Sequence, residues 1–303
     1  MTFRRYAGLT LAYNLAVIVW GAFVRASGSG AGCGRHWPLC NGTVLQKSPR
    51  LETIIELVHR TTSGLALVAV LVLFVWARRR FAAGHLARRA AVFSLIFIVT
   101  EAAVGAGLVL LELVAGNDSM LRAGYLAVHL TNTFLLIGSL TLATIWGGER
   151  RPVPRAAGSD RDRRWIFGVA LALIAVGISG AITALGDTLF PAASLAAGLE
   201  QDRSATAHLL LRLRVIHPIA AGAAGIAAIL GGWRLTRRIA DERLARWAAT
   251  VTGLVLVQWV AGTVNLLLLA PVALQLVHLV LADLVWLAWV AVGAHATTTA
   301  ERT

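Results

Sequence analysis

The chain has 303 residues, of which 57% are hydrophobic and only 14% are charged, and its mean hydropathy is +0.72. A soluble domain carries roughly 25% charged side chains, so this composition excludes an ordinary soluble protein and indicates an integral membrane protein. The formal net charge of +13 would by itself suggest a nucleic-acid partner, but the placement of the positive residues excludes that class.

Eight apolar runs follow one another along the chain, each close to the roughly 20 residues that cross a hydrocarbon core as a helix. The first run, with Arg4 and Arg5 before it, also resembles a signal peptide. Seven further runs follow, so we expect an uncleaved first helix. The sequence predicts an all-α integral membrane protein with transmembrane helices over 7–25, 55–77, 90–112, 123–146, 165–184, 209–233, 247–269 and 272–294.

The positive residues give the expected topology. Most of the 28 Lys and Arg lie at the two termini or in the loops after the second, fourth and sixth runs, as in Arg78, Arg79 and Arg80. Because positive residues mark cytoplasmic loops, the sequence predicts a multi-pass protein of the cell membrane with both termini in the cytoplasm. Tryptophans at the same ends of the runs fit an aromatic belt in the lipid interface: Trp76, Trp146, Trp165, Trp233 and Trp247.

The chain also contains an internal repeat of four helices. Long and short outer loops alternate, and shifting the sequence by about half its length aligns residues of the same type. We therefore expect two pseudo-repeated four-helix bundles, at 1–146 and 165–303, joined by an Arg-rich cytoplasmic linker at 147–164. The aligned pairs are Gly28 with Gly186, His59 with His217, Gly64 with Gly222, Glu101 with Gln258, Gly105 with Gly262, and His129 with His278.

Four of the eight histidines lie inside apolar runs, one in each even-numbered run: His59, His129, His217 and His278. Each lies one to two turns from the outer end, so at 1.5 Å per residue all four share one shallow depth. Ionisable residues within membrane helices indicate function, imidazole ligates haem iron, and bundles hold cofactors from facing helices. The pattern predicts two haem sites, His59 with His129 and His217 with His278. We expect His36, His85, His208 and His295 to be ordinary polar residues.

The two repeats differ chemically beside these histidines. Glu56 shares a helix face with His59, about 5–6 Å away at Cβ, and its counterpart in the second repeat is Arg214. A carboxylate in an apolar site can act as an acid, base or nucleophile, although Glu56 could instead simply pair with Arg60.

Other charged residues near the outer ends leave alternatives open. Arg122, Arg212 and Arg214 either contact haem propionates or anchor their helices at the lipid interface. Glu101 and Asp283 lie inside runs and need partners that the sequence does not name.

Cys33 and Cys40 lie in the first outer loop with six residues between them. A disulfide is the expected state on an oxidising side of a membrane, since two cysteines alone do not complete a zinc site. The sequence leaves open whether such a disulfide is structural or redox-active.

Together these features resemble the haem A synthase family, in its bacterial branch with a loop cysteine pair. The resemblance covers nearly the whole chain, through the segments 24–30, 37–42, 56–60 and 186–191 and the four histidines within the runs. It implies oxidation of the C8 methyl group of haem O to a formyl group by successive hydroxylations. His59 and His129 would hold the substrate haem beside a catalytic Glu56, and His217 and His278 would hold the iron of a haem b that transfers electrons. Cys33 and Cys40 would form the disulfide.

Two other functions compete with this one. A di-haem b electron-transfer cytochrome would hold the same groups without changing them, but histidines at one depth do not suit electron transfer across the membrane. A haem transporter would bind and release haem, but transporter sites tend towards the middle of the membrane. For an enzyme, we expect haem O synthase and cytochrome oxidase assembly factors among the partners, besides membrane lipid and with no nucleic acid; a homo-oligomer stays open.

Overall fold

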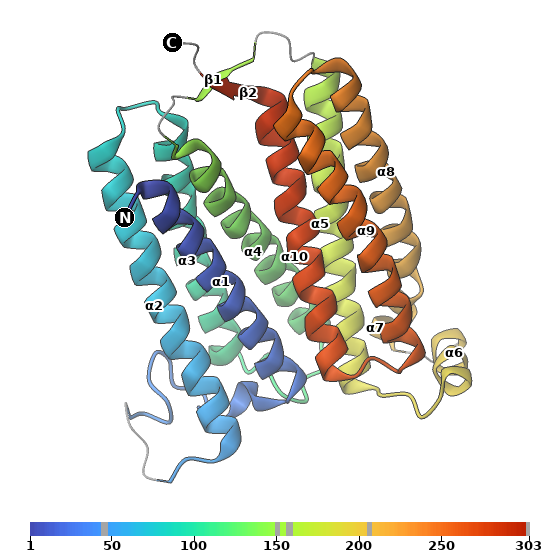
Figure 1. Ribbon diagram of the computed structural model, residues 1–303. Coiled ribbons are helices and arrows are strands. Elements are labelled where there is room, and N and C mark those ends of the chain that lie inside the picture. The colour runs from blue at the N-terminus through green and yellow to red at the C-terminus, as the bar shows by residue number, and fades with distance from the viewer. Residues whose placement is uncertain (44–47, 149–151, 156–159, 205–207, 301–303) are drawn as a thin grey trace.

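The computed structural model describes residues 1–43, 48–148, 152–155, 160–204 and 208–300, and these are almost entirely helical (Figure 1). The α-helices are α1 (Phe3–Ala26), α2 (Leu51–Arg80), α3 (Leu86–Leu110), α4 (Met120–Trp146), α5 (Asp160–Leu189), α6 (Leu195–Arg203), α7 (Leu209–Arg214), α8 (Ile216–Arg238), α9 (Glu242–Leu267) and α10 (Val272–Thr297). A short 3-10 helix, η1 (Ser29–Ala31), and two strands, β1 (Pro152–Pro154) and β2 (Thr298–Ala300), complete the described elements.

Eight helical segments in the described part of the chain are long and apolar enough to cross a membrane, which confirms the expected spans. Most extend beyond the apolar runs, as where α2 continues to Arg80. The sixth span, Leu210–Arg238, comprises α7 and α8, which meet at Val215. Pro218 explains this interruption, because proline has no N–H to bond the carbonyl four residues before it, that of Arg214.

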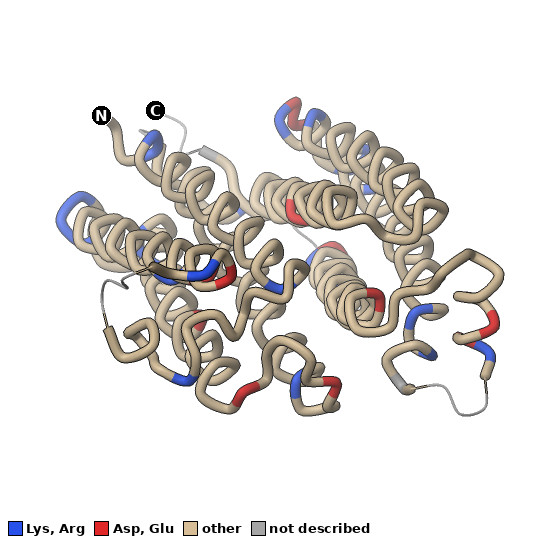
Figure 2. Tube along the Cα trace, turned by 90° about the horizontal axis from the view of Figure 1, so that it is seen from below, with Lys and Arg blue, Asp and Glu red and all other residues tan. Residues whose placement is uncertain are grey.

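The spanning helices pack as two rings of four. The first bundle consists of α1 to α4, and the second bundle consists of α5, the span formed by α7 and α8 together, α9 and α10. Within each ring, helices consecutive in the chain are neighbours and the last returns to the first, so α2 lies diagonally opposite α4 and α8 opposite α10. The bundles meet through α1 and α4 on one side and α5 and α10 on the other. An end-on view shows the two groups side by side (Figure 2). The domain limits remain a prediction, and linker residues 149–151 and 156–159 lie outside the described residues.

Both chain termini lie at one end of the bundles, here called the termini end, and the loop with Cys33 and Cys40 lies at the other, called the disulfide end (Figure 1). At the termini end, β1 pairs with β2 in antiparallel fashion. Arg155, directly after β1, donates to the carbonyls of His295 and Thr298 and pairs with Asp241. The described part of the linker is therefore fastened to the end of α10.

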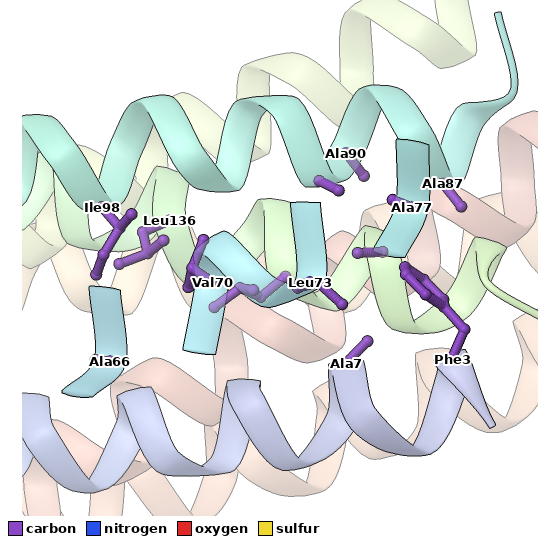
Figure 3. Packing of buried hydrophobic residues seen from close by; sticks show 13 residues of the cluster. Phe3, Ala7, Ala66, Val70, Leu73, Ala77, Ala87, Ala90, Ile98 and Leu136 are labelled. Atoms are coloured by element: carbon purple, nitrogen blue, oxygen red, sulfur yellow. The ribbon is translucent and has the colours of Figure 1, made fainter. Parts of the chain in front are cut away.

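The largest apolar cluster of each bundle lies in its half nearer the termini. In the first bundle it includes Val70 and Leu73 of α2, fully buried against α1, α3 and α4 (Figure 3). In the second bundle it includes Leu235 of α8 and Trp289 of α10. In the even-numbered spans, the residues of these two clusters lie about two turns or more beyond each histidine. A smaller apolar cluster of Ala123, Leu185 and Leu210 lies nearer the disulfide end.

Candidate functional site

The four intramembrane histidines all enter from the disulfide end, within roughly three turns of the start of their spans. His59 and His129 come from the diagonal helices α2 and α4, and His217 and His278 come from the diagonal helices α8 and α10. Helices that face each other diagonally direct side chains into the bundle interior. The fold thus gives each bundle one matched histidine pair.

In the second bundle the structure brings the two imidazoles together. The ring centroids of His217 and His278 are 6.3 Å apart and the ring planes are nearly perpendicular, at 83°. The Oγ atom of Ser179, on α5, lies 2.9 Å from Nδ1 of His217. A hydrogen bond to Nδ1 fixes the tautomer and leaves Nε2 available as a ligand.

Several imidazole nitrogens remain without partners. Nδ1 of His59, His129 and His278 is buried and has no hydrogen-bond partner among the described residues, although a carboxylate oxygen of Glu101 lies 3.5 Å from that of His129. Buried polar atoms are nearly always bonded, so these nitrogens indicate sites that are completed by another group.

Each of the four imidazoles lies against a glycine of the preceding span. A Cβ atom built on that glycine would lie 2.8 to 4.0 Å from the imidazole Cε1, and in three of the four cases this distance is below 3.0 Å, which real Cβ atoms do not adopt. An alanine would therefore displace the ring at those three positions. The pairs are Gly21 with His59 (2.8 Å), Gly105 with His129 (4.0 Å), Gly180 with His217 (2.9 Å) and Gly262 with His278 (2.9 Å).

Glu56 is buried near the start of α2, with 3% of its surface exposed. Its Oε2 accepts the Cys33 N–H at 2.7 Å, and its Oε1 pairs with the Arg60 guanidinium, whose Nε lies at 3.0 Å. Arg60 also donates to the carbonyls of His36 and Leu39. The pairing with Arg60 considered from the sequence is therefore present, and it ties the carboxylate to the disulfide loop.

Cys33 and Cys40 are joined by a disulfide, as expected, and both are buried. The loop between them is the one that Arg60 contacts, so the disulfide, Arg60 and Glu56 form one connected structure. His36 contributes its carbonyl oxygen to this structure.

Glu101 of α3, whose partners the sequence did not name, faces His129 with Oε1 3.5 Å from Nδ1. Its oxygens accept hydrogen bonds from Asn132 Nδ2 and Thr133 Oγ1. Its counterpart Gln258 lies 3.3 Å from Nε2 of His278, measured from the amide nitrogen. In both bundles, then, a polar residue of the odd-numbered span faces the imidazole of the next span.

The three arginines predicted to contact propionates have protein contacts of their own. Arg122 is buried and donates to the carbonyls of Ala115 and Asn117. Arg214 pairs with Asp187 at 3.0 Å and Asp202 at 3.6 Å, while Arg212 is exposed on α7. Burial and the nearby Arg214 act in opposite directions on the pKa of the Asp202 carboxyl, and burial raises it overall. Propionate binding by these arginines stays a prediction.

Sequence reasoning missed Arg25, which links the two bundles. From the end of α1 it donates to the carbonyl of Ala184 at 2.9 Å, to Thr188 Oγ1 at 3.0 Å and to Gln275 Oε1 at 3.1 Å. Gln275 lies one turn before His278 on α10. A cation inside a span should have signalled this role, but its partners lie in the distant repeat.

Asp283 is also buried, and neither carboxylate oxygen has a hydrogen-bond partner among the described residues.

The fold and the site define a polytopic helical membrane protein with a histidine pair in each of two bundles. A family model described as COX15-CtaA, cytochrome oxidase assembly protein, matches residues 4–290. The chain belongs to this family.

Of three similar proteins, two are named heme A synthase and one is named for another activity. The chain is 44% identical over 291 residues to a Thermus thermophilus protein named protoheme IX farnesyltransferase, covering 96% of this chain and 48% of that protein. It is 36% identical over 182 residues to a heme A synthase of Geobacillus kaustophilus, covering 58% of this chain and 54% of that protein. A heme A synthase of Alkalihalophilus pseudofirmus is 33% identical over 180 residues, covering 58% and 57%. The chain thus spans about half the length of the curated relatives it matches.

Proposed function

We propose that this chain is a haem A synthase, which oxidises the C8 methyl group of haem O to a formyl group by successive hydroxylations. The observation that carries the proposal is the pair of facing imidazoles of His217 and His278, together with a matching diagonal pair in the first bundle. Membership of the family and the two relatives named heme A synthase support it.

The residues of the second bundle fit a haem. Metal–imidazole bonds are about 2 Å long. Two such bonds, plus the distance from nitrogen to ring centroid in each imidazole, approach the 6.3 Å between the centroids of His217 and His278. Two histidines suffice, because the macrocycle supplies the remaining ligands to iron. Among the described residues, no group of three or more His, Cys, Asp or Glu side chains forms a metal site.

The two sites have different tasks in this proposal. His59 and His129 hold the substrate haem O, and His217 and His278 hold a haem b. The overall change, R–CH₃ + H₂O → R–CHO + 4 H⁺ + 4 e⁻, requires acceptors for both protons and electrons. His217 and His278 would hold this haem b, which would supply one-electron transfer to an acceptor outside this chain.

Glu56 is the proposed catalytic carboxylate, since it lies one turn from His59 and its counterpart in the second bundle is Arg214. Arg60 and the Cys33 N–H hold its carboxylate in position. There it can accept a proton that leaves the methyl group, or stabilise positive charge that develops on that carbon. The water that supplies the oxygen would enter from the disulfide end, where the polar groups lie.

The Thermus relative supports a second candidate, a farnesyltransferase acting on protohaem. This chain matches only 48% of that protein, so a transferase activity can reside in the other half. The matched histidine pairs favour oxidation, because prenyl transfer changes no oxidation state and needs no second haem.

Extraction of haems followed by mass spectrometry tests the proposal. The chain is expressed with and without a haem O synthase in cells that lack their own haem A synthase. Haem A, or its hydroxylated precursor, formed only when both proteins are present is the expected result. Haem O formed by this chain alone would instead establish the transferase. Unmodified haem O from folded, haem-loaded protein would move the assignment to a di-haem cytochrome, and folded protein that holds no haem would overturn the proposal.

The setting of the reaction forms part of the proposal. The protein would work in the cell membrane with its haem sites towards the extracytoplasmic face, receive haem O from a haem O synthase, and serve the assembly of cytochrome oxidase.

A further inference from the structure

Two odd-numbered spans repeat one pattern, a polar residue followed four positions later by a glycine. The pattern is Glu101 and Gly105 on α3, and Gln258 and Gly262 on α9. Residues four apart lie on one helix face, and both members of each pair face the histidine of the following span, as described above. We call each pair an imidazole cradle.

The glycine of each cradle makes room for the ring. At Gly262 an added Cβ would lie 2.9 Å from Cε1 of His278, whereas at Gly105 it would lie 4.0 Å from Cε1 of His129. The second cradle therefore fits its imidazole closely, and the first leaves it about 1 Å of freedom.

The polar residue differs in charge between the cradles. Glu101 brings a carboxylate to within 3.5 Å of Nδ1 of His129, and within the described chain no Lys or Arg pairs with that carboxylate. Asn132 and Thr133 fix its oxygens. Gln258 brings a neutral amide, whose nitrogen lies 3.3 Å from Nε2 of His278, so the second cradle faces the other ring nitrogen and leaves Nδ1 without a hydrogen-bond partner among the described residues. The amide also donates to the backbone carbonyl of His278 at 3.1 Å.

This difference has a known consequence for an iron ligand. A carboxylate that accepts the second N–H of a ligating imidazole orients the ring and increases its basicity. A more basic ligand, with a negative charge close by in a medium of low dielectric constant, favours oxidised iron. A neutral amide orients the ring without adding charge.

We propose that the two cradles are positioning elements for the iron-ligating imidazoles, and that the Glu101 carboxylate makes iron in the first bundle easier to oxidise than iron in the second. Electrons would then flow from the substrate site towards the second bundle. The inference rests on haem binding at these histidines, as in the proposed function, and adds the residues that give the flow its direction.

Redox titration of the haem absorption bands, on full-length protein purified with its haems, tests this inference. Glu101→Gln keeps size and hydrogen bonding, so we expect unchanged haem content and a more positive midpoint potential at the first site alone. Gln258→Glu is the matched exchange and should lower the midpoint potential at the second site alone. Glu101→Leu, which removes the polar partner, should reduce haem content in the first bundle.

The outcomes separate the cradles from the proposed function. If both haems bind but the exchanges leave both potentials unchanged, the inference is wrong, whatever the yield of haem A. If the potentials move as expected and wild-type protein makes no haem A, the inference stands and the proposed function fails. A purely structural role of Glu101 would change haem content in Glu101→Gln without shifting the potential, and this would also overturn the inference.

Discussion

Gly262→Ala should selectively weaken haem binding in the second bundle. The added Cβ would lie 2.9 Å from Cε1 of His278, where ordinary contact begins at 3.4 Å, so the ring or helix must move by about 0.5 Å. Metal sites tolerate displacements of about 0.2 Å, and overpacking typically costs about 1–3 kcal/mol. At 1.4 kcal/mol for each factor of ten, the affinity for haem at this site should fall roughly 5- to 150-fold.

Gly105→Ala is the matched control for this variant. The added Cβ would lie 4.0 Å from Cε1 of His129, an ordinary contact, and alanine favours a helix by about 1 kcal/mol over glycine. Haem content of the first bundle should therefore be unchanged. The assay is the ratio of haem to purified protein, followed by titration of depleted protein with haem b. A Gly262→Ala protein with wild-type affinity, or equal losses in both variants, would refute the steric reasoning.

Three further predictions concern other parts of the molecule. Glu56→Gln should lower haem A yield at least about a hundredfold with haem content retained, both read by mass spectrometry; undiminished yield would remove Glu56 from the chemistry. Arg25→Met removes three hydrogen bonds between the bundles, worth about 2–4 kcal/mol net, so Tm in detergent should fall by roughly 5–10 °C, and an unchanged Tm would contradict that linking role. Burial would raise the pKa of Asp241, but the Leu244 N–H and Arg155 together lower it below the usual 3.8. The contribution of Asp241 to stability is therefore complete above about pH 4 and is lost as the pH falls through the lowered pKa. A profile of thermal stability against pH should show this loss in wild-type protein and not in Asp241→Asn.

Much of the architecture could be predicted from the sequence, because it depends on local composition. Apolar length defined the spans, and one histidine in each even-numbered run indicated the polar end of each bundle, since a helix of known pitch fixes depth. The cysteine pair in the first outer loop predicted a disulfide, which the structure contains.

The contacts of the site that could not be predicted from the sequence depend on how helices rotate and pack against one another. Glu101 was recognised as a residue that needs a partner, but its approach to His129 depends on the rotation of α3 against α4. Arg25 finds its partners in the other bundle, which no pattern within one helix reveals. The contact of Glu56 with the Cys33 N–H likewise depends on the path of an irregular loop.

The apolar packing between the histidines and the termini end forms a layer of low dielectric constant in that half of the bundles. Closely packed apolar residues such as Leu73, Leu140 and Trp289 occupy that half of the bundles, together with a few buried polar groups that include Ser94, Ser139 and Asp283. Protons released by the proposed oxidation would start among the charged groups near the disulfide end, Glu56 and Glu101 among them.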